Sequence, residues 1–222
     1  MEIDLIEELY ANKEVNYFSL ERQIFKDAVK ENGLKILDIG CGTGILGAYF
    51  KINQNATVYG VEISRSAYEK ASKNLDRVIR GNIETLEIDF ERDFFDVIVM
   101  GDVVEHLVNP MDTIGRLVPF LRPGGKIHIT VPNVRHWSVV KPLLFSDNWE
   151  YKDWGILDYT HLKFFTKRSF SEMLNRIDQL TITRLERVIQ KRSKSSVFNL
   201  LTFNVFSGFL ASHTFVSLEK LK

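Results

Sequence analysis

Short apolar runs alternate with amphipathic stretches through most of the chain. The runs are rich in Val and Ile, and a single polar residue, Asp96, interrupts the run at 95–100. Such runs predict strands, and a nearly continuous run predicts a strand that is buried on both faces. The predicted strands cover residues 35–39, 57–62, 77–81, 95–100, 126–131, 180–188 and 213–220.

Apolar residues at helical spacing fill the gaps between these strands. The predicted helices lie at about 44–52, after Ser64 as an N-cap, at about 111–121 and at about 167–177. This alternation indicates an α/β fold, with a doubly wound, mostly parallel sheet and helices on both faces. The length of 222 residues is consistent with a single domain over 1–222.

Two segments stand outside this alternation. Residues 1–33 carry apolar residues at helical spacing and end at Asn32 and Gly33, which predicts an N-terminal helical segment. Residues 133–165 hold all three tryptophans and show no clear period. We interpret 133–165 as an inserted cap over the active site, because long loops in compact domains are often functional. The alternative is that its tryptophans only cover the core.

A third segment, 195–218, contains no Asp, Glu, Lys or Arg and is long enough to cross a membrane. It also holds Asn199, Asn204 and His213, and this polarity argues against a transmembrane helix. We expect a buried helix followed by a core strand, with an interfacial helix as the alternative. Membrane contact is therefore open but not expected.

Composition narrows the class of partner and the compartment. Lys+Arg and Asp+Glu are both 29, so the net charge is zero and no nucleic-acid partner is expected. Cys41 is the one cysteine, which fits a reducing compartment, and the acidic N-terminus lacks the features of a signal peptide. We expect a cytoplasmic protein, and the sequence leaves its oligomeric state open.

The first predicted strand runs into a loop with three glycines, Gly40, Gly42 and Gly44. Glycines let backbone N–H groups approach a ligand because no Cβ blocks the way. A strand that leads through such a loop into a helix places the ligand at the carboxyl edge of the sheet. Asp38, just before the loop, disfavours a pyrophosphate and suits a cationic ligand. S-adenosylmethionine, with its ammonium and sulfonium, is such a ligand.

Glu62 ends the second predicted strand, 18 residues after Gly44. A carboxylate at this place can accept hydrogen bonds from both hydroxyls of a ribose. The alternative is a surface acid at the end of a strand, but the glycine loop upstream favours ribose binding.

Five motifs follow one another in a fixed order: Asp38 to Gly44, Glu62, Gly81 to Glu84, Asp96 to Leu107, and Leu121 to Ile127. In this order they resemble the class I S-adenosylmethionine-dependent methyltransferases. The later run Asp153 to Thr166 is similar to a segment of a small bacterial subgroup near ubiquinone-type and surface-polysaccharide methyltransferases. The resemblance implies a Rossmann-like seven-stranded sheet whose antiparallel last strand lies between strands five and six.

The resemblance also implies a cofactor site for S-adenosylmethionine. The loop glycines and Asp38 would surround its methionine part, Glu62 would hold the ribose hydroxyls, and Ile63 would pack on the adenine. Tyr17 would cover the methionine carboxylate. Gly101 and Asp102 would line the cofactor beside the transferred methyl.

Asn82 and Ile83 would meet the adenine edge. The commoner pattern of the family has Asp where this chain has Asn82, but an amide oxygen can still accept a hydrogen bond from the adenine amine.

A hydroxyl acceptor would need a base for its proton, and histidine is the usual one. His106 and His161 are the candidates, although each could equally be a packing residue; we interpret His128 and His213 as structural. Asp102, Glu105 and His106 could alternatively bind a hard divalent ion. We expect no metal, because the sequence shows no second ligand cluster.

The acceptor is the least determined feature. The aromatic cap could stack on a sugar, a ring or an isoprenoid tail, and its lysines could receive a phosphate. We therefore expect O-methylation of a small-molecule, glycan or lipid-linked substrate. The alternatives are a non-catalytic S-adenosylmethionine-binding module and an NAD(P)-dependent oxidoreductase, because Gly42, Gly44 and Gly47 also fit a dinucleotide loop.

Overall fold

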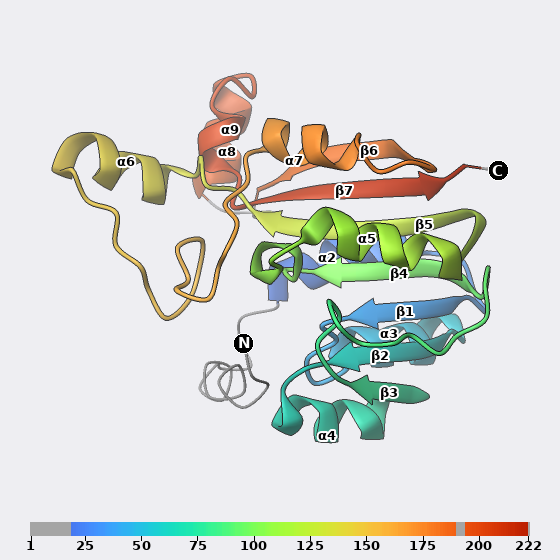
Figure 1. Cartoon of the computed structure of the whole chain (residues 1–222). Helices are drawn as coiled ribbons and strands as arrows, with labels where there is room; N and C mark the ends of the chain where they lie inside the picture. Colours follow the sequence, from blue (N-terminus) through green and yellow to red (C-terminus); the bar gives the residue numbers. More distant parts are fainter. Residues whose placement is uncertain (1–18, 190–193, 222) are drawn as a thin grey trace.

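The computed structural model describes residues 19–189 and 194–221. Its seven strands form one sheet in the order β3-β2-β1-β4-β5-β7-β6 (Figure 1). β7 is antiparallel to both of its neighbours, and the other neighbouring strands are parallel, so the predicted topology is confirmed. The strands are β1 (Lys35–Ile39), β2 (Thr57–Glu62), β3 (Arg77–Arg80), β4 (Phe95–Gly101), β5 (Leu121–Pro132), β6 (Leu180–Val188) and β7 (His213–Lys220).

Helices cover both faces of the sheet and create two apolar cores. On one face, α2 (Ser19–Ala28), α3 (Ile45–Gln54) and α4 (Arg65–Asn74) bury side chains such as Phe25 and Phe50. On the other face, α5 (Pro110–Leu117) and α7 (Lys167–Leu174) bury Ile114 and Phe170. The sheet therefore lies in the middle of three layers, as its apolar strands require.

Local sequence signals explain where several helices begin. Ser64 is the N-cap of α4, and its Oγ accepts a hydrogen bond from the N–H of Ala67 at 3.4 Å. Thr166 and Ser169 form a capping box at the start of α7. Pro110 stands in the first turn of α5, where its missing N–H costs nothing. Two short 3₁₀ turns, η2 (Val104–His106) and η3 (Val118–Phe120), follow β4 and α5.

The chain reverses its direction of winding between β1 and β4. It moves from β1 outward to β2 and β3, then returns to β4 on the other side of β1 and continues to β5. In open sheets of this kind, ligands bind outside the carboxyl ends of the strands at the point of reversal. The glycine loop after β1 and the residues that follow β4 meet at this point.

The structure corrects two expectations about element boundaries. β5 begins at Leu121, not at 126, so the predicted turn around Pro123 and Gly124 lies inside the strand, and the β4 pairing shifts register there. The predicted cap contains a helix, α6 (Trp137–Ser146), despite its Pro142. His136 begins that helix as its N-cap, because its ring nitrogen accepts from the N–H of Ser138.

The buried helix expected within 195–218 is wrong. The segment forms α8 (Lys194–Leu201) and α9 (Ser207–Leu210), and their large apolar side chains are mostly exposed. The core strand expected after it is confirmed as β7. Among the described residues, no helix has both the length and the apolar content needed to cross a bilayer. The predicted segment 1–33 is described only from Ser19 onward.

Candidate active site

The three loop glycines adopt left-handed backbone angles, with φ of 66° at Gly40, 55° at Gly42 and 77° at Gly44. A Cβ at Gly40 would lie 2.5 Å from Cγ2 of Val103, and one at Gly44 would lie 3.1 Å from Cα of Ala71. A Cβ at Gly42 would meet no atom within 4 Å. Gly40 and Gly44 are therefore required for packing, whereas Gly42 faces open space that a ligand can occupy.

Glu62 connects the end of β2 to the glycine loop. Its two carboxylate oxygens accept hydrogen bonds from the N–H groups of Gly42 and Ser64, each at 2.8 Å. Burial raises the pKa of Glu62, and the backbone hydrogen bonds partly oppose this rise. Each carboxylate oxygen has a second lone pair that can accept a ribose hydroxyl.

Two further groups of the loop are buried beside Glu62. Asp38, in β1, is buried and brings a second carboxylate to this edge of the sheet. Burial raises the pKa of the Cys41 thiol, and the negative charges of Asp38 and Glu62 raise it further. Cys41 therefore stays protonated and is no nucleophile. This loop presents negative charge and backbone groups.

The loop after β3 forms the predicted adenine side of the site. Ile83 is buried, and Ile63 is partly exposed. The Oδ1 of Asn82 already accepts the N–H of Glu84 at 3.0 Å, so one of its two lone pairs remains for adenine. Arg116, on α5, donates to the carbonyl groups of Glu84 and Leu86 and holds the loop in place.

Asp102 follows β4 and is fixed by β5. Its backbone has a φ of 55°, and its Oδ1 accepts the hydroxyl of Thr130 at 3.1 Å. A Cβ at Gly101 would lie 3.0 Å from the ring of Phe25, so packing explains this glycine. The structure thus places Gly101 and Asp102 at the carboxyl end of β4, beside the glycine loop.

His213 lies at the same edge, although we interpreted it as structural from its sequence. Its Nε2 is 3.6 Å from Oδ1 of Asp102. His213 is the first residue of β7 and pairs with Pro132, the last residue of β5. The start of an antiparallel strand meets the carboxyl end of its neighbour. The predicted antiparallel β7 was therefore the signal that could have placed His213 beside Asp102.

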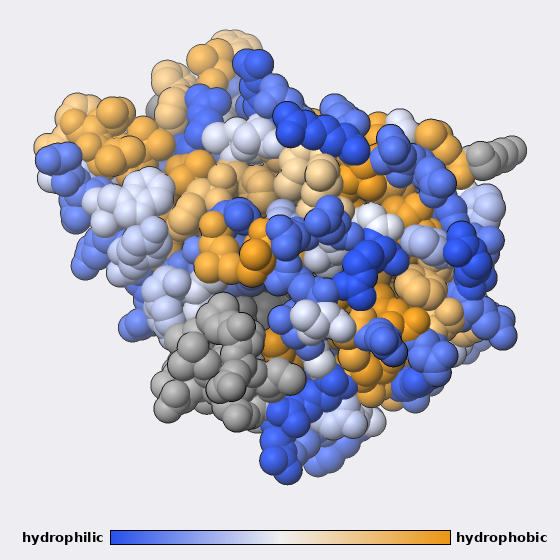
Figure 2. All heavy atoms as spheres, in the orientation of Figure 1, coloured by the Kyte–Doolittle hydropathy of each residue, from blue (hydrophilic) through white to orange (hydrophobic). Residues whose placement is uncertain are grey.

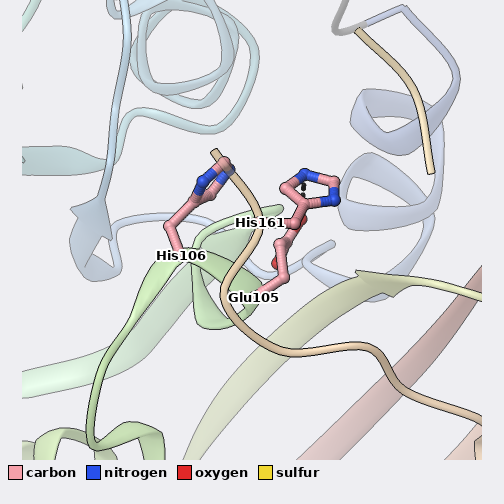
Figure 3. Close-up of side chains that lie close together, drawn as sticks. All are labelled: Glu105, His106 and His161. Carbon is pink, nitrogen blue, oxygen red and sulfur yellow. Dashed lines mark ion pairs between the residues drawn. The ribbon is translucent and has the colours of Figure 1, made fainter. Parts of the chain in front are cut away.

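Three polar side chains gather where η2 meets the loop after α6: Glu105, His106 and His161 (Figure 3). Nδ1 of His106 lies 3.1 Å from the carbonyl oxygen of Thr160. Nδ1 of His161 lies 3.0 Å from the carbonyl oxygen of Ile156. A carbonyl can only accept, so both rings carry a proton on Nδ1.

His161 and Glu105 form a buried pair. Nε2 of His161 lies 3.9 Å from Oε1 of Glu105, and both side chains are buried. The backbone joins the same two segments, because the carbonyl oxygen of Glu105 accepts the N–H groups of Leu162 and Lys163 at 2.8 and 3.0 Å. The pair therefore clamps the loop after α6 onto η2.

The same cluster contains donors that could hold a metal ion. One ligand atom from each of Glu105, His106 and His161 lies within 4.8 Å of the others. The sequence instead suggested Asp102 as the third ligand, and Asp102 is not a member of this group. The 3.9 Å between Nε2 of His161 and Oε1 of Glu105 requires no metal ion, so the expectation of no metal stays a prediction.

Three further residues, His128, His136 and Tyr17, remain to be placed. His128 is buried within β5, and its Nδ1 is 2.9 Å from Oγ of Ser217. Burial lowers the pKa of His136, and the charge of His213 lowers it further. Tyr17 lies outside the described residues.

The sheet order, the left-handed glycine loop and the buried Glu62 define a class: the class I S-adenosylmethionine-dependent methyltransferases. The family model described as a methyltransferase domain matches residues 8–179. The chain belongs to this family. S-adenosylmethionine is the cofactor of the class, and the open space at Gly42, whose N–H donates to the buried Glu62, fits it.

Sequence similarity to named methyltransferases supports this family assignment. The chain is similar to the mitochondrial ubiquinone biosynthesis O-methyltransferase of Schizosaccharomyces pombe, with 34% identity over 111 residues, 47% of this chain and 40% of that protein. The ubiquinone biosynthesis O-methyltransferase of Bradyrhizobium sp. (strain ORS 278) is 34% identical over 110 residues, 48% of this chain and 43% of that protein. The chain thus spans less than half the length of these relatives.

The fold is also similar to that of a solved structure. An S-adenosylmethionine-dependent methyltransferase from Aquifex aeolicus superposes on this chain with a TM-score of 0.64 at 14% identity, and the match covers 100% of both chains. At this identity the likeness concerns the fold alone.

Proposed function

We propose that the protein transfers a methyl group from S-adenosylmethionine to a hydroxyl oxygen of a small-molecule, glycan or lipid-linked acceptor. The position of His106 carries this proposal: it follows β4 at the edge where Asp102 and the glycine loop lie, and Thr160 fixes its ring. The relatives named in ubiquinone biosynthesis are O-methyltransferases, which supports a hydroxyl acceptor.

The bound cofactor supplies a methyl group that a positive sulfonium already activates. The protein therefore mainly has to place the acceptor in line and take up its proton. Glu62, whose carboxylate already accepts the N–H of Gly42, would hold the ribose hydroxyls, and the open space at Gly42 would admit the methionine part.

His106 is the proposed base. Because its Nδ1–H donates to the carbonyl of Thr160, the basic lone pair is on Nε2. Asp158 fixes Thr160 in turn, since one carboxylate oxygen accepts both its hydroxyl at 2.7 Å and its N–H at 2.9 Å. A ring held in this tautomer can take the acceptor proton at Nε2 as the oxygen–carbon bond forms.

We assign His161 a positioning role, which leaves His106 as the preferred base of the two predicted histidines. Its Nδ1 donates to the carbonyl of Ile156, and its Nε2 faces the carboxylate of Glu105. Both nitrogens are therefore directed at protein groups and not at the methyl acceptor. His161 instead holds the loop that carries Thr160, and Thr160 orients His106.

Aromatic rings next to this loop support an acceptor with an apolar or sugar face. Phe164 packs edge-on against Trp149 at 5.5 Å between ring centroids, and Tyr151 lies 6.3 Å from Phe164. The ring of His161 is 6.3 Å from the same phenylalanine. The aromatic cluster thus extends from the histidine pair toward the exposed side of the loop.

A transfer assay tests the proposed function. The protein is incubated with S-adenosylmethionine labelled in its methyl group and with three hydroxyl acceptors: a catechol-type ring, a nucleotide sugar and an isoprenoid-linked sugar. We expect label in at least one product and a loss of kcat of at least tenfold in His106→Gln, with an unchanged Kd for S-adenosylhomocysteine. Cofactor binding without transfer to any hydroxyl would favour the non-catalytic module. Normal kcat in His106→Gln would remove His106 as the base.

A further inference from the structure

Two helical segments on one side of the molecule expose large apolar side chains. Figure 2 shows apolar residues over α6 and over α8 and α9. Phe145, at the end of α6, is 80% exposed, and Phe203, between α8 and α9, is 88% exposed. The exposed apolar residues of this face, which we call the apolar face, are Trp137, Leu143, Leu144, Phe145, Val197, Leu200, Leu201, Phe203, Val205 and Phe206.

The two segments are held together as one surface. Asn133, at the end of β5, donates from Nδ2 to the carbonyl groups of Gly208 at 2.9 Å and Ala211 at 2.8 Å. This fixes α9 beside the start of the segment that leads into α6, and the two helices are in contact. Both project from the same end of the sheet in Figure 1. Exposed apolar side chains of this size and number on one face of a protein indicate an interaction site.

Cationic side chains lie directly beside the apolar face. Arg135, Lys167 and Arg187 line one pocket together with Gly208 of α9. The guanidinium of Arg135 stacks over Phe209 at 4.9 Å, and NH1 of Arg187 lies 3.5 Å from Oγ of Ser207. No carboxylate of the described residues lies within ion-pair distance of these three cations.

The sequence shows the same imbalance of charge. Residues 113–146, which contain α6, and residues 187–218, which contain α8 and α9, have no Asp or Glu. The second range begins with four basic residues within eight positions: Arg187, Lys191, Arg192 and Lys194. The helices α6, α8 and α9 therefore carry basic residues and no acid, although Asp147 follows α6 directly.

We propose that the apolar face and its cationic pocket dock on an anionic phospholipid bilayer. Apolar side chains that enter the acyl boundary, next to Lys and Arg that contact lipid phosphates, are the combination that holds a protein at a membrane surface. A second copy of the chain fits less well, because a two-fold interface would bring Arg135, Lys167 and Arg187, which have no ion-pair partner among the described residues, against themselves. The interfacial alternative for 195–218 is thereby preferred over the buried helix.

Sedimentation with vesicles tests the proposal with the full chain. We expect the protein to bind vesicles of phosphatidylcholine and phosphatidylglycerol in equal parts, and to bind vesicles of phosphatidylcholine alone at least tenfold more weakly. High salt should weaken the first interaction, because it screens the contacts between cations and phosphates.

Matched variants identify the surface. Phe145→Ser combined with Phe203→Ser should lower the partition coefficient roughly tenfold or more, since each phenylalanine loses its burial in the bilayer. Ile52→Ser is the control, because Ile52 is 82% exposed on α3, away from the apolar face. Lys167→Gln combined with Arg187→Gln should weaken binding to the anionic vesicles only, whereas Lys70→Gln combined with Lys73→Gln on α4 should not.

Three results would overturn the proposal. The first is the absence of binding to anionic vesicles at low salt. The second is equal binding by wild type and the Phe145→Ser, Phe203→Ser variant. The third is a dimer, measured by sedimentation equilibrium, that the same double variant dissociates; this result would assign the apolar face to a second copy. Each result is independent of methyl transfer, because vesicle binding requires neither the cofactor nor an acceptor.

Discussion

At the scale of single residues, the site depends on backbone positions that only glycine adopts easily. Gly40 and Gly44 are enclosed by Val103 and by Ala71, whereas Gly42 faces open space. The sequence predicted that all three glycines and Glu62 belong to the candidate site. The glycines form one motif, and Glu62 follows that motif at the end of the next strand. The sequence did not place His213 beside Asp102, since a residue at the start of an antiparallel strand reaches this edge only after the sheet has formed.

The first prediction concerns Gly42. Gly42→Val should fold but lose measurable affinity for S-adenosylmethionine, because its side chain would occupy the space that the ligand needs. The left-handed backbone would also cost about 1–2 kcal/mol of stability. Gly33→Val is the matched control, since Gly33 has a φ of 73° and equally open surroundings outside the site. Calorimetry that shows wild-type affinity in Gly42→Val would contradict the assigned role of the loop.

The second prediction concerns Glu62. Glu62→Ala should weaken S-adenosylmethionine binding by about 1–3 kcal/mol, the usual effect of removing a charged hydrogen-bond acceptor. Asp76→Ala is the control, because Asp76 also accepts a backbone N–H, from Val58 at 2.7 Å, but at the opposite end of β2. An unchanged dissociation constant in Glu62→Ala, measured by calorimetry, would remove Glu62 from the site.

Glu62 should also make cofactor binding depend on pH. Burial raises its pKa above the ordinary value of 4.5, so the carboxylate takes up a proton at a higher pH than an exposed glutamate does. In the assigned role, ionised Glu62 would accept the ribose hydroxyls, and affinity should therefore fall as the pH decreases through the raised pKa. Glu62→Gln should abolish this dependence. An affinity that stays constant down to pH 4.5 in wild type would contradict the assignment.

At the scale of elements, the sequence predicted those whose apolar pattern is continuous. β1, β2, β6 and β7 have the predicted boundaries. The predictions failed for elements whose boundaries or burial depend on neighbouring parts of the fold. β5 extends through a Pro-Gly-Gly segment because β4 pairs with its first residue, and α8 exposes Leu200 and Leu201 to solvent. The hydrophobic pattern alone cannot distinguish a helix that packs on the core from one whose apolar side chains remain exposed.

The pairing of β5 with β7 should make the fold sensitive to acid. Burial is the main reason that the pKa of His128 falls from 6.5 to about 4. Between these values the unfolded chain binds a proton that the folded chain excludes. This contribution to stability is therefore complete above pH 6.5 and is lost as the pH falls toward 4, by about 3 kcal/mol. Urea titrations at pH 7 and pH 4.5 should show this loss, and His128→Asn should show a smaller one. Equal losses would contradict it.

The contact between η2 and the loop after α6 should hold without a metal ion. If the Glu105–His161 pair is an ion pair, a chelator should change neither the melting temperature nor the rate of transfer. A loss of activity on chelation that Mg²⁺ or Zn²⁺ restores would instead make Glu105, His106 and His161 a metal site.

At the scale of the whole molecule, the sheet order and the composition have separate consequences. The topology brings Asp38, Glu62 and Asp102 to one edge, although 64 residues separate the first from the last. The zero net charge excluded a general attraction to polyanions but concealed the local excess of cations at the apolar face. The net charge of a chain does not show where its charges lie on the surface, because that depends on the fold.

The cofactor site is tested most directly by a calorimetric titration of the purified protein with S-adenosylmethionine, S-adenosylhomocysteine and NADH in parallel. We expect micromolar binding of the two adenosyl ligands and no binding of NADH. Binding of NADH without the adenosyl ligands would contradict the assigned cofactor site and favour the oxidoreductase alternative for the glycine loop.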